Sequence, residues 1–422
     1  EGYTYTLNNT TIKGTRDTRP LWPSVDVNTT STIATAFVSD SVNSLVTKSQ
    51  ESVAYNDAYS GSDWVWEDTF GNEASLGVWK TVDNADDLPV YLPSDLDGFI
   101  VEVSGGTTGE FDNYYLTYDY AGRTWRETVK PGVKTTIDAT TMPHVLYRLA
   151  DGSFLLDEFE GVQASGLALD GVSKWEKRTS GGGDSTEDPS FLDKNITNIF
   201  FHKNRLGMIT KDSIILSKTG DYGAFFPTTI QEVLADDPID LAIASTDVTI
   251  LSHAVSTSGH IFLFSDDTQF VVESLEAALT PKTADIVALS SYTYGHNAPA
   301  KSIGNKVFFT NQAGGYSQLY SYKVTEQGSK LTEADPMTIH LTTYIDKSAS
   351  RITGHDVLGY TFIETSDKPK ELVVLTSVSK GTKDLQNAFH KWVFEKNIVS
   401  TMIINNSLYI LFSDGTLNTI SL

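Results

Sequence analysis

Short runs of apolar and β-branched residues, separated by turn-forming residues, recur along most of the chain. Residues 261–272 turn at Asp266-Asp267, and residues 408–420 turn at Asp414-Gly415. Such runs between turn formers are typical of β-strands, and Asp-Gly between two of them is the strongest local signal of a hairpin. The pattern therefore predicts an all-β, mainly antiparallel fold.

From about residue 195 onward, strand-turn-strand units follow one another at irregular intervals of roughly 50 residues, the spacing of four-stranded propeller blades. Further turns lie at Lys203-Asn204, Lys211-Asp212 and Gly314-Gly315. Residues 389–422 resemble one blade of four strands. The sequence thus predicts a propeller-like core of many hairpins, although a β-sandwich would give a similar pattern.

The N-terminal part has a different pattern. Cap residues at 28–31 precede apolar residues three and four positions apart, from Ile33 to Val46, which predicts a short amphipathic helix. Residues 51–145 hold strand candidates between clusters of Gly, Asp and Tyr, at 64–66, 99–103 and 114–118.

These patterns divide the chain into three parts. Residues 1–50 would form part of an N-terminal α+β domain, residues 51–145 a small β-rich domain or insertion, and residues 146–422 a propeller-like domain that is incomplete at its C-terminal end. The chain begins at Glu1 and stops at Leu422, both next to or within strand-like runs. We therefore expect both ends to have been cut from a longer protein.

The chain is strongly acidic, with a net formal charge of -23 from 54 acidic and 31 basic residues. Such a surface repels phosphates, which disfavours a stable nucleic-acid-binding module but allows a passage through which nucleic acid slides without sticking. Cysteine is absent, which excludes disulfides and thiolate metal sites. No apolar run approaches the roughly 20 residues that a membrane-spanning helix needs, so we expect no membrane span.

Signatures of catalysis are missing from the sequence. The eight histidines show no pair at the spacing of a helix-borne zinc site, and no phosphate loop, nucleophile elbow or dinucleotide fingerprint occurs. Carboxylates cluster at residues 157–160, 236–240 and 266–267, and solvated turns are their simplest interpretation. We therefore predict that the chain is not an enzyme and has no catalytic, cofactor-binding or metal-binding residues.

A local basic group stands out within this acidic chain, formed by Lys203, Arg205, Lys211 and Lys218. These residues could contact phosphate, pair with an acidic neighbouring subunit, or lie without a partner on one exposed hairpin face. A subunit contact is favoured over DNA, because the surrounding negative charge would outweigh isolated phosphate contacts.

Residues 200–207 (Phe-Phe-His-Lys-Asn-Arg-Leu-Gly) and 214–222 (Ile-Ile-Leu-Ser-Lys-Thr-Gly-Asp-Tyr) resemble a segment of the tail tubular protein B family, the tail nozzle proteins of short-tailed bacteriophages. The resemblance is strongest from about residue 85 to 285 and extends more weakly to both ends. The family-motif structural residues within it are Asn204, Gly207, Gly220, Asp221, Tyr222, Asp237, Pro238, Asp240, Asp266, Gln269 and Pro281.

The resemblance implies a structural subunit of a tail nozzle. Such a subunit would form a homohexameric ring below the tail adaptor protein, help anchor tail fibres, and let viral double-stranded DNA pass without specific binding. Residues 1–50 would be part of a platform-like domain, and the protein would be assembled in the host cytoplasm and reside in the virion tail. No cofactor is implied. The rival hypothesis is a tail-associated polysaccharide-binding or -degrading β protein, which would need two carboxylates across an aromatic cleft.

Overall fold

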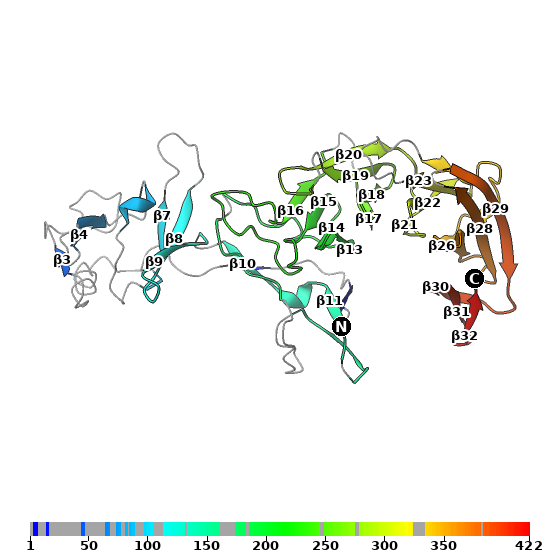
Figure 1. The fold of residues 1–422 in the computed structure, drawn as a ribbon, viewed down its shortest axis with the longest axis horizontal. Coiled ribbons are helices and arrows are strands. Elements are labelled where there is room, and N and C mark those ends of the chain that lie inside the picture. The colour runs from blue at the N-terminus through cyan, green and yellow to red at the C-terminus, as the bar shows by residue number, and fades with distance from the viewer. Residues whose placement is uncertain are drawn as a thin grey trace. The chain divides into compact units, whose positions relative to one another are not determined.

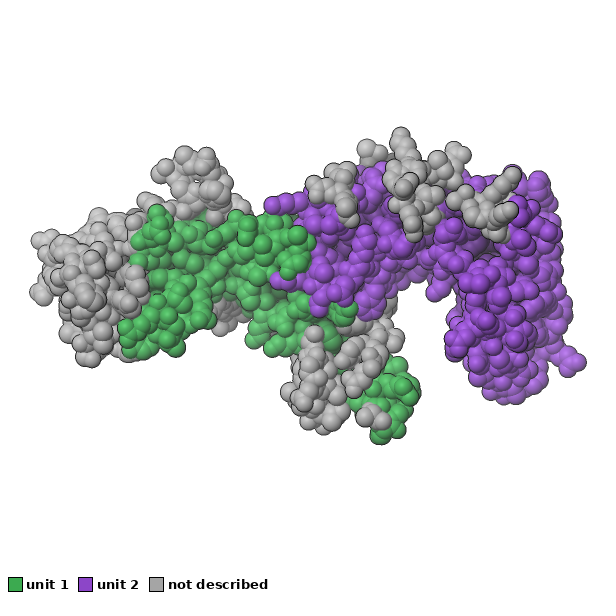
Figure 2. Space-filling model, viewed as in Figure 1, with its two compact units in different colours: residues 1–193, 221–238 green, residues 194–220, 239–422 purple. Residues whose placement is uncertain are grey.

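The computed structural model describes residues 84–88, 97–98, 100–103, 113–130, 133–149, 151–159, 174–182, 185–244, 249–274, 278–323, 334–380 and 383–422, and short strands before them. The chain forms two compact units (Figure 2). Unit 1 comprises residues 1–193 and 221–238, and unit 2 comprises residues 194–220 and 239–422. The backbone therefore passes between the units three times, after residues 193, 220 and 238.

Unit 2 is a series of five antiparallel sheets, each made of consecutive strands (Figure 1). The first sheet contains β13 (Asn198–His202), β14 (Arg205–Ile209), β15 (Ser213–Leu216) and β16 (Ile239–Ala242). The second contains β17 (Leu251–Ser256), β18 (Ile261–Ser265), β19 (Gln269–Ser274) and β20 (Ala284–Ser290). The third contains β21 (Lys301–Ile303), β22 (Lys306–Ala313), β23 (Tyr316–Lys323), β24 (Asp335–Pro336) and β25 (Ile345–Asp346). The fourth contains β26 (Ala349–His355), β27 (Tyr360–Thr365), β28 (Glu371–Lys380) and β29 (Lys383–Val393), and the fifth β30 (Ile398–Ile404), β31 (Ser407–Phe412) and β32 (Leu417–Ser421).

Apolar layers join these sheets in chain order. The first strands of successive sheets, β13, β17, β21, β26 and β30, are also neighbours in space. Stacked sheets of consecutive antiparallel strands whose first strands adjoin form a propeller-like core. The fold class predicted from the hairpin pattern is therefore confirmed.

Middle strands of unit 2 bury both of their faces. In β18, Ile261 and Leu263 belong to the apolar layer shared with the first sheet, whereas Phe262 and Phe264 belong to the layer shared with the third. Successive side chains of a strand point to opposite faces, so a strand between two apolar layers needs an apolar residue at every position. This explains why such strands are continuous apolar runs in the sequence.

Local turn chemistry sets the hairpins between these strands. Lys203 and Asn204 both have positive φ, 44° and 61°, as the two central residues of a type I′ turn require. Gly415, with φ of 82°, follows Asp414, whose carboxylate accepts the Thr416 N–H at 3.1 Å and its hydroxyl at 2.6 Å. The hairpin predicted at Asp414-Gly415 is therefore confirmed as the β31–β32 connection.

Unit 1 consists of small sheets. One joins β1 (Tyr3–Thr6), β11 (His144–Arg148) and β12 (Phe154–Asp157), and another joins β2 (Gly14–Arg16) and β10 (Lys134–Ile137). A third joins β3 (Ser44–Val46), β4 (Trp64–Glu67) and β5 (Glu73–Leu76), and a fourth joins β6 (Thr81–Val82), β7 (Ile100–Val103), β8 (Tyr114–Asp119) and β9 (Thr124–Thr128). Strands β6 and β7 run parallel, whereas every other pair of described strands is antiparallel. The described helices are two 3-10 turns, η2 (Ala85–Asp87) and η4 (Ala139–Thr141).

The predicted amphipathic helix between residues 28 and 46 is wrong at its C-terminal end. Ser44–Val46 form strand β3, with Leu45 opposite Trp66 of β4. Pairing with a distant strand overrides a local pattern of apolar positions, as is common where helix propensity is weak. Residues 28–43 lie outside the described residues.

Replacement of Phe264 tests the two-faced burial. Phe264 is 0% exposed, and its ring centroid lies 4.9 Å from that of Tyr294 and 5.4 Å from that of Phe309. Phe264→Ala should lower the free energy of unfolding by about 3–5 kcal/mol through lost burial and a residual cavity. In the same denaturant titration, Phe201→Ala, at a position 47% exposed, should cost less than about 1 kcal/mol. Equal losses in both variants would contradict the assigned packing.

Candidate functional site

The predicted basic group does not form one exposed face. Arg205 is only 2% exposed, and its Nη1 donates to the carbonyl of Ser217 at 2.8 Å. Lys203 is exposed in the β13–β14 turn, whereas Lys211 is exposed beyond the opposite end of β14. Lys218 is half-buried after β15. Arg205 thus holds the end of β15, and a subunit contact through the exposed lysines stays a prediction.

Several residues of the family resemblance shape the first sheet. The Gly220 N–H donates to the Asn204 carbonyl at 2.9 Å, and Gly220 has φ of +80°. Gly207 lies opposite Phe200 on β13, so close that a Cβ on Gly207 would be 2.3 Å from the Phe200 ring. The glycine is therefore required for the ring to lie flat across the neighbouring strand.

Replacement of Gly207 tests whether its close approach to the Phe200 ring contributes to stability. Gly207→Ala should lower the free energy of unfolding by about 1–3 kcal/mol, because the Phe200 ring or the backbone must shift. The matched control is Gly259→Ala, where a Cβ would meet nothing within 4 Å and stability should change little. Chemical denaturation of both variants gives the comparison, and an unaffected Gly207→Ala protein would refute the role of close approach.

Two carboxylates, one buried and one half-buried, hold the loop that follows Pro227 in unit 1. Asp237 is 2% exposed, and its two carboxylate oxygens accept the N–H groups of Thr228 at 3.1 Å and Leu234 at 2.9 Å. Glu127 of β9 accepts from the Ile230 N–H at 3.0 Å and from the Thr229 hydroxyl at 2.6 Å. Each carboxylate accepts hydrogen bonds from two donors of the loop, so the role of both carboxylates is structural.

The remaining family-motif residues also have local roles or surface positions. Asp221 caps its own turn by accepting the Gly223 N–H at 3.1 Å. Tyr222, Pro238 and Pro281 are half-buried, and Asp240 is exposed on β16. In the described structure, these four residues and Asp221 do not form a common binding or catalytic site.

Gln269 and Asp266 tie the second sheet to the chain that follows it. Gln269 is fully buried; its Nε2 donates to Tyr292 O at 2.8 Å, and its Oε1 accepts Tyr292 N at 3.1 Å and Ser290 Oγ at 2.9 Å. Asp266 Oδ1 lies 2.9 Å from His296 Nε2 at the surface. A buried amide that pairs with both backbone groups of one residue fixes that segment.

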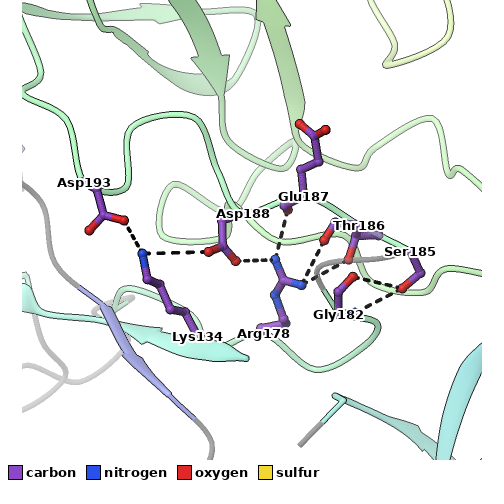
Figure 3. A network of polar contacts seen from close by, with 8 residues as sticks. All are labelled: Lys134, Arg178, Gly182, Ser185, Thr186, Glu187, Asp188 and Asp193. Carbon is purple, nitrogen blue, oxygen red and sulfur yellow. Dashed lines mark hydrogen bonds and ion pairs between the residues drawn. The ribbon is translucent and has the colours of Figure 1, made fainter. Parts of the chain in front are cut away.

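A polar network centred on Arg178 was not anticipated from the sequence (Figure 3). The Arg178 side chain is fully buried and donates to Thr186 O at 3.2 Å, Glu187 O at 2.9 Å and Asp188 Oδ1 at 3.0 Å. Its guanidinium lies over the Phe226 ring, 5.0 Å from the centroid. Asp188 also lies 3.9 Å from Lys134 Nζ, and Lys134 pairs with Asp193. Burial lowers the pKa of Arg178, while Asp188 opposes that effect.

His202 is a buried titratable side chain whose protonation affects stability. It is buried, with Nδ1 3.0 Å from Ser256 Oγ. Burial, followed by the charges of Lys203 and His260, lowers the pKa of His202 from 6.5 to about 4. The fold therefore favours the neutral imidazole.

The free energy of unfolding should decrease as the pH is lowered, because His202 is buried in its neutral form. The folded pKa lies below the unfolded one, so the stabilisation is complete above about pH 6.5 and is lost as the pH falls toward 4, by on the order of 3 kcal/mol. His202→Asn should flatten this part of the curve in urea titrations between pH 7 and about 4. Parallel curves for the two proteins would contradict the assigned burial of the charge.

The described residues contain no metal site. Within them, no three His, Asp or Glu side chains are placed to share a metal ion. Among the predicted carboxylate clusters, Asp157 accepts the Glu158 N–H at 2.9 Å and Asp236 is exposed. No helix of the described part of the chain is long and apolar enough to cross a membrane.

Comparison with known proteins identifies the class. The sequence profile of the bacteriophage nozzle proteins matches residues 2–420. The chain therefore belongs to the bacteriophage nozzle protein family, as the sequence resemblance predicted. Among curated proteins, it is similar to the tail tubular protein gp12 of Escherichia phage T7, with 27% identity over 326 residues that cover 77% of this chain. The chain spans 39% of the length of that relative.

Solved structures with similar strand arrangements are distant. One is the β-propeller domain of Cps50 (Swd1) from Myceliophteria thermophila, with a TM-score of 0.33 and 11% identity, covering 66% of this chain and 83% of that chain. Another is Sqt1 from Saccharomyces cerevisiae, with a TM-score of 0.34 and 13% identity, covering 73% of this chain and 76% of that chain. At such scores the fold assignment depends on the strand pairing described above.

Proposed function

We propose that the chain is part of a subunit of a homohexameric nozzle ring that continues the DNA ejection channel below the tail adaptor protein and helps anchor tail fibres. The family match over residues 2–420 is the observation that carries this proposal. The T7 relative is a tail tubular protein, and a tube built from one protein requires repeated subunits around an axis.

The charge of the chain suits a channel wall. The net charge of -23 makes the average surface repulsive to the phosphates of double-stranded DNA. DNA would therefore pass without specific binding, and ejection would depend on low adhesion rather than on chemistry.

We also propose an assignment of parts to this function. Residues 1–50 would belong to a platform-like α+β domain, residues 51–145 to a small β-rich domain or insertion, and residues 146–422 to an incomplete β-propeller. The consecutive antiparallel sheets of unit 2, of three to five strands each, support propeller blades. The compact units divide the chain after residue 193 rather than after 145, and assign residues 221–238 to unit 1.

Electron microscopy of the full-length protein, alone and with its adaptor protein, tests the proposal. Six-fold rings with a central opening should form, and the adaptor should dock coaxially on one face. A protein that stays monomeric at high concentration and with the adaptor, or that releases sugars from a capsular polysaccharide, would overturn the nozzle assignment and favour the polysaccharide hypothesis.

A further inference from the structure

Unit 2 contains a cavity of about 810 Å³ where the first strands of its sheets meet. Residues of β13, β17, β21, β26 and β30 line it, so all five sheets contribute to its wall. Among the described strands, each of these five pairs within its sheet along one edge only. Backbone N–H and C=O groups of the other edge need partners in or across the cavity, which makes the wall polar.

Side chains from neighbouring sheets satisfy some of these backbone groups. His253 Nε2 lies 3.1 Å from the Ala300 carbonyl oxygen, and Asn198 Oδ1 accepts the Ala254 N–H at 3.3 Å. Burial lowers the pKa of His253, the hydrogen bond to Ala300 raises it, and the charge of Lys301 lowers it further. The positive charge of Lys301 therefore acts on His253 from the adjacent sheet.

The cavity wall is cationic in an acidic chain. Its lining includes Lys301 of β21 and Arg351 of β26 and no Asp or Glu. Lys301 has no ion-pair partner within the described residues. Two cations are thus placed around one cavity, although acidic residues outnumber basic ones by 54 to 31 in the whole chain.

Glu364, the described carboxylate nearest to Arg351, is also hydrogen-bonded to Thr401. Arg351 Nε lies 3.8 Å from Glu364 Oε1, a distance at the limit of an ion pair. The same oxygen accepts the Thr401 N–H at 2.8 Å and the Thr401 hydroxyl at 2.6 Å. Glu364 therefore holds β30 against β27 and leaves the guanidinium donors of Arg351 available for a closer acceptor.

We infer that this cavity binds a small ligand through an oxyanion group, a phosphate, sulfate or carboxylate, held by Lys301 and Arg351. Ser302 and Thr353 line the same cavity, and each carries a hydroxyl that can donate to the remaining oxygens. The volume is within the range of pockets for small ligands. The inference depends on the geometry of unit 2 and not on the proposed role in the tail.

Calorimetric titration of the full chain with inorganic phosphate, at constant ionic strength in potassium chloride, tests the site. Saturable binding at one site per chain is expected. Lys301→Met should weaken it by about tenfold or more, because a charge-assisted hydrogen bond is lost. Lys282→Met, at an exposed lysine outside the lining, should leave the affinity unchanged. Glucuronate in place of phosphate separates the two sources: tighter binding of glucuronate indicates an acidic sugar, and tighter binding of phosphate indicates a phosphorylated ligand.

A second measurement needs no variant. In NMR titrations of the unmodified chain, saturating phosphate should raise the pKa of His253, because the bound negative charge offsets the effect of Lys301. Absence of saturable binding for both anions would overturn the inference. An equal loss of affinity in Lys301→Met and Lys282→Met, or a His253 pKa that does not respond to a bound anion, would also overturn it.

Discussion

Burial of both faces of the same strands is the constraint on which unit 2 depends. Phe262 and Leu263 are adjacent in the chain, yet they pack in apolar layers on opposite sides of one sheet. The second, third and fourth sheets are each the shared wall of two layers, and a change in one layer is transmitted to the next through a single strand. The absence of cysteine means that packing and hydrogen bonds alone maintain this series.

Buried and half-buried charged groups bond the backbone where it leaves regular strands. Asp237 and Glu127 accept backbone N–H groups, and Arg178 donates to backbone carbonyls and to Asp188. A buried charge is tolerated when its hydrogen-bonding capacity is largely satisfied. In the irregular loops of unit 1, side chains therefore provide the hydrogen-bond partners that the backbone of a strand finds in the neighbouring strand. Among the described residues, the buried acidic side chains are Asp237 and Glu364.

The sequence predicted what is encoded locally. The Asp414-Gly415 hairpin needs only turn residues and flanking strands, and the propeller-like core follows from such hairpins in series. The burial of Arg205 was not predictable, because its acceptor Ser217 becomes a neighbour only when β14 and β15 pair. The amide of Gln269 is likewise matched to Tyr292, 23 positions away. The family resemblance identified these positions, but only the three-dimensional contacts explain their roles as supports of turns and loops.

The path of the backbone between the two units has a mechanical consequence. Residues 221–238 lie in unit 1 although unit 2 precedes and follows them in the chain. Tension between the units would be divided among three covalent crossings, so separating them requires drawing out an internal segment instead of straightening one linker. A single cleaved peptide bond at any of these crossings would leave the units tethered by the other two.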